Sequence, residues 1–140
     1  MNHRGTSIDR SARVLAAALC LAVVWLHIDD QGGIPGDETP HYIAIAYYLL
    51  EGGGVVCAGL LLAGVRTGRY ADVWLLATWV ANGPLLGNVL ARIPDIPDYD
   101  TDDNYWTDPP GVESIIVEVL LLVLSIAMTF RASPPRPLSS

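Results

Sequence analysis

The sequence predicts an all-α membrane protein: a four-helix antiparallel transmembrane bundle with both termini in the cytoplasm. Two observations support this prediction, namely four long apolar segments and the confinement of basic residues to one set of connecting segments. Of the 140 residues, 51% are hydrophobic, which exceeds what a soluble domain of this size normally carries. We therefore expect a lipid-facing surface, with the lipid bilayer as the first partner of the chain.

Four segments are long and apolar enough to cross a bilayer. About 20 apolar residues are needed to span ~30 Å of hydrocarbon, because an α-helix rises ~1.5 Å per residue. The first segment resembles a signal peptide, but no A-x-A cleavage site follows it and acidic residues come at once. We expect one uncleaved domain over residues 1–131 and a disordered cytoplasmic tail over residues 132–140. The four predicted spans are residues 12–28, 42–65, 71–93 and 112–130.

The charged residues predict the orientation. Seven of the eight basic residues precede the first span, lie in the second connection or follow the last span. The other two connections, residues 29–41 and 94–111, are acidic. Because basic residues favour the cytoplasmic side, we expect both acidic loops to be extracytoplasmic in a multi-pass protein of the plasma membrane. Trp25 is expected near the outer boundary, and Tyr70 and Trp74 near the inner one, where amphipathic rings prefer to lie.

Small residues and a proline predict how the helices pack. Gly54 and Ala58 form a small-x-x-x-small pair in the second span, and Gly59 and Gly64 follow in the same segment. Small residues of this kind let helix backbones approach closely. In the third span, Pro84 removes a backbone donor, and we expect a kink there.

The candidate functional residues are polar side chains at membrane depth. An ionisable group there costs roughly 3 kcal/mol on insertion scales, so it is expected to face the bundle interior and to have a partner or a function. Glu51 is predicted close to the bilayer mid-plane. Tyr47 lies one helical turn away on the same face, and Asn82 lies at a similar depth in the third span. These three residues are predicted to form one cluster.

A second polar layer is predicted nearer the outside. It contains Asn88, Arg92 and Glu118, and Glu118 is expected either to keep its proton or to pair with Arg92. The fourth span also carries a polar stripe that falls within an arc of about 60° at ~100° per residue and is expected to point inward. The stripe consists of Ser114, Glu118, Ser125 and Thr129.

Two interpretations fit the two intramembrane carboxyl groups. In the first, Glu51 and Glu118 form interhelical hydrogen bonds worth ~1 kcal/mol each, and the protein is a structural or accessory component that binds a membrane partner protein. In the alternative, they line a site open to the outside that binds a proton, a cation or a small polar ligand. A transporter of this kind is expected to be a homodimer, because four helices rarely enclose a pathway alone.

Catalytic and nucleic-acid-binding classes are not predicted. The sequence contains no P-loop, G-x-S-x-G or H-E-x-x-H motif, and we expect no catalytic residue and no enzyme activity. The net charge of −7 argues against a nucleic-acid partner, because such proteins concentrate positive charge on one face.

Cofactors and metals are not expected either. His3 is assigned to the cytoplasm, and His27 and His41 to the outer interface, so no histidine pair is available to hold a haem. Cys20 and Cys57 are predicted to differ in depth by ~10 Å, beyond disulfide reach. The acidic segment 95–104 lacks the glycine of an EF-hand, which leaves open a weak Ca²⁺ site or a solvated loop.

Four features together resemble a set of small four-helix bacterial membrane proteins. These are the arginine-flanked first span ending in Trp25-Leu26-His27, the turn Ile34-Pro35-Gly36, the glycine-rich second span, and Glu118 in the fourth. The resemblance covers most of residues 10–130. It implies the four-helix fold and no particular activity.

Overall fold

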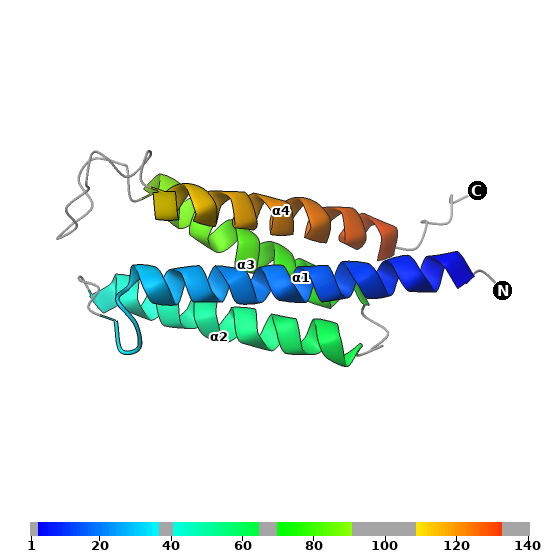
Figure 1. Ribbon diagram of the computed structural model, residues 1–140, viewed down its shortest axis with the longest axis horizontal. Coiled ribbons are helices and arrows are strands. Elements are labelled where there is room, and N and C mark those ends of the chain that lie inside the picture. Colours follow the sequence, from blue (N-terminus) through cyan, green and yellow to red (C-terminus); the bar gives the residue numbers. More distant parts are fainter. Residues whose placement is uncertain (1–2, 37–40, 65–69, 91–108, 133–140) are drawn as a thin grey trace, which may run out of the picture.

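The computed structural model describes residues 3–36, 41–64, 70–90 and 109–132. These residues form four α-helices, shown in Figure 1: α1 (His3–Asp30), α2 (His41–Ala63), α3 (Tyr70–Leu90) and α4 (Pro109–Ala132). Each contains a segment long and apolar enough to cross a membrane, and the all-helical class and the four candidate spans are therefore confirmed. The segments are Ile8–Asp30, His41–Ala63, Asp72–Leu90 and Gly111–Arg131. The tail and the acidic segment 95–104 lie outside the described residues.

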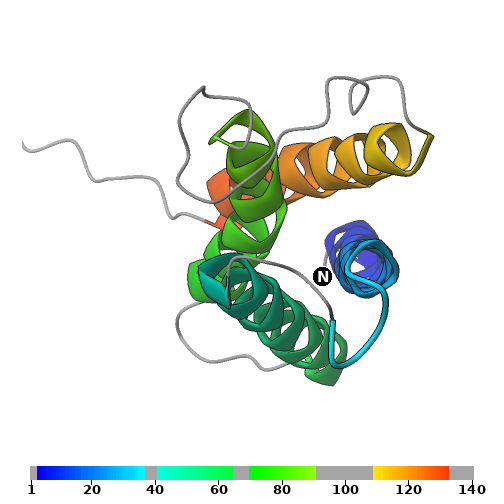
Figure 2. The same ribbon diagram turned by 90° about the vertical axis from the view of Figure 1, so that its left-hand side faces the viewer.

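The contacts between helices place α1 and α3 against all of the others. α1 contacts each of the other three helices, and α3 contacts both α2 and α4. The end view in Figure 2 shows α1 beside α2 and α4, with α3 across from it. In Figure 1 the start of α1 and the end of α4 lie at the same end of the molecule. Side chains of α1 can therefore reach residues of both α2 and α4.

A close approach of α1 and α2 fixes how these two helices are aligned. A Cβ atom added at Gly54 would lie 2.5 Å from Cγ2 of Val24 and 3.5 Å from the carbonyl oxygen of Cys20. Gly54 and Ala58 are both buried, as expected for a small-residue contact between helices. Gly59, by contrast, is exposed and faces away from the helix contact.

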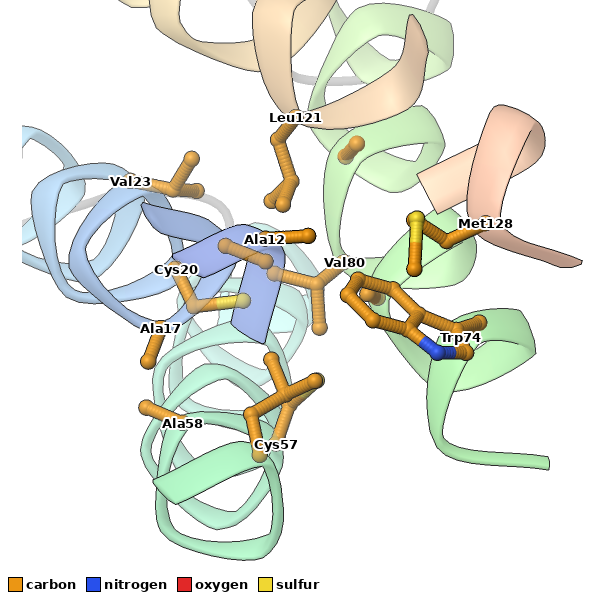
Figure 3. Packing of buried hydrophobic residues seen from close by; sticks show 14 residues of the cluster. Ala12, Ala17, Cys20, Val23, Cys57, Ala58, Trp74, Val80, Leu121 and Met128 are labelled. Atoms are coloured by element: carbon orange, nitrogen blue, oxygen red, sulfur yellow. The ribbon is translucent and has the colours of Figure 1, made fainter. Parts of the chain in front are cut away.

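The core lies between the four helices, and Trp74 is part of it. Figure 3 shows its indole beside Met128, and only 1% of Trp74 is exposed. Its depth at the inner membrane boundary stays a prediction, but the side chain faces the core and not the lipid. Ala77 and Ala81 lie three and seven residues further along α3 and are also buried, so Trp74 belongs to the inward face of the helix and fills the space that these small residues leave.

The polar stripe of α4 faces inward, as predicted. Glu118 and Ser125 are fully buried, and Ser114 and Thr129 are partly buried. The Thr78 hydroxyl of α3 donates a hydrogen bond to Ser125 Oγ at 3.0 Å, which joins α3 to α4. Helix α3 continues through Pro84, and the kink expected there stays a prediction.

Candidate functional site

A group of polar residues, here called the polar cluster, lies where α1 ends. Its members come from three helices and from the turn after α1: His27, Gln31, Tyr47, Glu51, Ser114 and Glu118.

The end of α1 places Gln31 against the bundle. The backbone N–H of Gln31 donates a hydrogen bond to the carbonyl oxygen of His27 at 3.0 Å, which continues the helical pattern for one further residue. Gly32 and Gly33 then have φ angles of +81° and +111°, a region that favours glycine, and the chain turns there. The chain passes close over the Gln31 side chain at Gly36, where an added Cβ would lie 2.8 Å from it. Gln31 is consequently only 2% exposed.

Gln31 connects α1 to the carboxyl group on α2. Its Nε2 donates a hydrogen bond to Glu51 Oε1 at 2.6 Å. Glu51 is 7% exposed, so both partners are shielded from solvent. A buried pair of this kind holds the two helices in one register, because a shift would leave the carboxyl oxygen without its donor.

Glu118 is the carboxyl group that α4 contributes. It is 0% exposed, and its Oε1 accepts a hydrogen bond from the Ser114 hydroxyl at 2.5 Å. The same oxygen lies 3.8 Å from Nε2 of His27. The other ring nitrogen of His27, Nδ1, is 2.9 Å from the carbonyl oxygen of Val23. Since a carbonyl can only accept, Nδ1 carries a hydrogen and Nε2 faces Glu118.

An aromatic residue completes the polar cluster. The ring centroids of Tyr47 and His27 are 5.4 Å apart with the planes tilted by 55°. The Tyr47 hydroxyl donates to Asp30 Oδ2 at 2.7 Å, which ties the start of α2 to the last residue of α1. His27 therefore lies between Tyr47 and Glu118.

The polar cluster offers acceptor atoms that nothing in the described part of the chain satisfies. Gln31 Oε1 and Glu118 Oε2 are both buried and have no hydrogen-bond partner there. Burying such an oxygen without a donor costs ~1–3 kcal/mol, and native proteins generally supply a partner. The arrangement is therefore suited to a molecule that brings N–H or O–H donors, or positive charge.

The structure brings together some of the predicted site residues and separates others. Glu51, Tyr47 and Glu118 all belong to one cluster rather than to two layers. Asn82 is exposed on α3, whereas Glu51 is buried and bound by Gln31, and a cluster of Tyr47, Glu51 and Asn82 stays a prediction. Asn88 is partly buried near the end of α3. Arg92, the predicted partner of Glu118, lies outside the described residues.

The depth of Glu51 in the membrane stays a prediction, but the structure gives its level relative to α1. Its partner Gln31 follows the last residue of α1, so Glu51 lies level with the end of that helix. The reason is the alignment of the helices, because the first turns of α2 extend beyond the end of α1.

Sequence reasoning missed His27 and Gln31, although a signal for them exists. Cys20 and Val24 are buried on α1, and His27 and Gln31 follow at the spacing of about one and two helical turns that keeps residues on one face. Extending the buried face past the apolar segment would have placed both side chains inside the bundle.

The two cysteines also differ from expectation. Both thiols are buried in the same core, and the backbone of α2 at Gly54, one turn from Cys57, approaches the carbonyl oxygen of Cys20. The predicted ~10 Å separation along the helix axes is therefore wrong. The prediction measured depth from the outer end of each span. Because α2 begins beyond the end of α1, Cys57 lies level with Cys20.

Comparisons with protein-family models, with curated proteins and with solved structures find no match to this chain. Among the described residues, no group of three or more histidine, cysteine or acidic side chains is arranged to hold a metal ion.

Proposed function

We propose that this is a multi-pass plasma-membrane protein without catalytic activity, which binds a small donor-bearing cation or polar molecule in the polar cluster. The observation that supports this proposal is the surplus of buried acceptors, Gln31 Oε1 and Glu118 Oε2. The nearby carboxyl groups of Glu51 and Glu118 favour positive charge over negative charge. An ammonium or guanidinium group matches both requirements, because it carries N–H donors and a positive charge.

The proposal includes an orientation. The helices form an antiparallel bundle with both termini in the cytoplasm, which places the polar cluster next to the loop 29–41 on the outer side. The distribution of arginines supports this orientation, because reversal would place the basic flanks outside against the insertion bias. In that orientation the acidic loops would raise the local concentration of cations by electrostatic steering.

Cysteine labelling tests the orientation. In intact cells, an impermeant maleimide should label Asp102→Cys and should label Thr67→Cys only after lysis. The unmodified chain gives the background, since Cys20 and Cys57 are buried. Labelling of Thr67→Cys from outside would overturn the orientation.

Ligand binding is tested in lipid nanodiscs with ammonium, methylammonium and guanidinium as probes. We expect at least one probe to raise the thermal unfolding midpoint of the unmodified chain, because a ligand that binds only the folded state stabilises it. Glu51→Gln and Glu118→Gln should lose most of this increase. Glu113→Gln is the matched control, because Glu113 is exposed on the same helix as Glu118. An equal response in all four proteins, or in none, would refute binding of these cations in the polar cluster.

Transport is the stronger form of this proposal, and it requires a homodimer. Proteoliposomes with a pH-sensitive dye inside should then show ammonium-dependent flux that Glu118→Gln abolishes. If flux and folding are unchanged in both glutamate variants, transport through the polar cluster is excluded.

A second candidate is a structural or accessory role, in which the protein binds a membrane partner. It is favoured by the bonds that the carboxyl groups already make, since Glu51 is bound by Gln31 and Glu118 by Ser114. Under this role the glutamates hold helices together and need no ligand. Purification in mild detergent should then recover a partner protein or a homo-oligomer, and a monomer in lipid without a partner would contradict it.

A further inference from the structure

The two cysteines of the chain meet in the core between α1 and α2. Cys20 and Cys57 are free thiols with 0% exposure. Gly54, one turn from Cys57, approaches Cys20 so closely that an added Cβ would lie 3.5 Å from the carbonyl oxygen of Cys20. Figure 3 shows both in the same part of the core, Cys20 from α1 and Cys57 from α2. The polar cluster uses neither of them, so this pair is a separate feature of the molecule.

Small residues let α1 and α2 approach closely beside the two thiols. Gly54 lies one turn from Cys57 on the buried face of α2, and its backbone approaches the carbonyl of Cys20. Ala17 and Ala58, which adjoin the pair on the two helices, are also buried. A disulfide needs Cα atoms about 4.4–6.8 Å apart, and a close approach of the two backbones favours such a spacing. Rotation of the side chains can then bring the sulfur atoms together.

The surroundings decide which chemistry suits the pair. Neighbouring core residues are apolar, among them Val23, Ala58 and Leu121. A zinc site takes four ligands, and among the described residues no third histidine, cysteine or acidic side chain joins this pair. A disulfide needs only the two sulfur atoms and is neutral.

The depth of the pair limits the possible oxidants. Cys20 lies ten residues before the end of α1, or ~15 Å along the axis, which is about half the thickness of the hydrocarbon. Oxidants dissolved in water do not reach a fully buried thiol at that depth, whereas a lipid-soluble molecule reaches the helices from the bilayer. Quinones are lipid-soluble and accept two electrons together with two protons.

We propose that Cys20 and Cys57 form an intramolecular disulfide when a membrane quinone oxidises them. Two S–H bonds break and one S–S bond forms, and the two electrons and two protons convert the quinone to a quinol. The disulfide crosslinks α1 to α2 in the same helix alignment in which Gln31 binds Glu51. Reduction restores two free thiols and removes the crosslink.

The test uses the full chain in nanodiscs, incubated without oxygen with a short-chain ubiquinone. After denaturation, remaining thiols are counted with a maleimide-polymer that shifts the band on a gel, and the intact mass is measured. We expect two adducts before treatment and none after it, with a mass lower by two hydrogen atoms. A protease site inserted in the 37–40 segment should then give α1 and α2 fragments that separate only after reduction.

The controls are Cys20→Ser and Cys57→Ser, each of which should keep one reactive thiol after quinone treatment and show no mass loss. Oxidised glutathione, which stays in water, should leave both thiols of the unmodified chain free. Two adducts after quinone treatment would overturn the proposal. A disulfide that links two chains in place of the two helices would overturn it as well.

Discussion

Substitution of Gly54 by alanine tests the close approach of α1 and α2. The added Cβ would lie 2.5 Å from Cγ2 of Val24, far inside van der Waals contact. Val24 cannot easily move away, because a β-branched side chain has few accessible χ1 rotamers in a helix. The helices must therefore separate locally, and such overpacking costs ~1–3 kcal/mol. We expect Gly54→Ala to destabilise the protein by about that amount.

Gly52→Ala is the matched control for this prediction. A Cβ at Gly52 would meet nothing within 4 Å, and replacing glycine by alanine within a helix gains about 0.5–1 kcal/mol. Thermal unfolding in nanodiscs of one lipid composition should separate the two variants by roughly 1.5–4 kcal/mol, with Gly54→Ala the less stable. If Gly54→Ala is as stable as Gly52→Ala, the helices do not approach as the structure indicates.

Three other substitutions probe single contacts by the same unfolding measurement. Thr78→Val removes the hydrogen bond to Ser125 and should cost about 1 kcal/mol; no change would show that this bond does not join α3 to α4. Gln31→Met leaves Glu51 Oε1 buried without its donor and should cost ~1–3 kcal/mol, whereas a neutral result would argue that water replaces the amide. Gly64→Ala places a side chain at a φ of +61° and should cost ~1–2 kcal/mol, and a more stable variant would contradict that backbone conformation.

Local sequence patterns predicted the features that depend on one helix alone. The four spans follow from the length of apolar segments, because lipid imposes the same requirement on every crossing. The inward face of α4 follows from helical periodicity, which places Glu118 and Ser125 on one side. The burial of Trp74 was not predicted, because the preference of aromatic rings for the membrane boundary was given more weight than the helical face that Trp74 shares with Ala77 and Ala81.

Features that depend on two helices could not be predicted in the same way. Hydropathy indicates where each apolar span begins. It does not indicate how far one helix is shifted along its neighbour, because that shift depends on how the side chains of the two helices pack. The first turns of α2 lie beyond the end of α1, and the sequence contains no direct signal for this offset. The separation predicted for Cys20 and Cys57 was wrong for that reason.

The same offset links the two sites of the molecule, and it gives a final prediction. Gly54 lies one turn from Glu51 in one direction and one turn from Cys57 in the other, with all three on the buried face of α2. A shift of α2 caused by a side chain at Gly54 should therefore disturb both contacts together. Gly54→Ala should slow disulfide formation by ubiquinone and also reduce the stabilisation by the bound cation, whereas Gly52→Ala should change neither. Loss of one property with full retention of the other would show that the close approach at Gly54 does not control both sites.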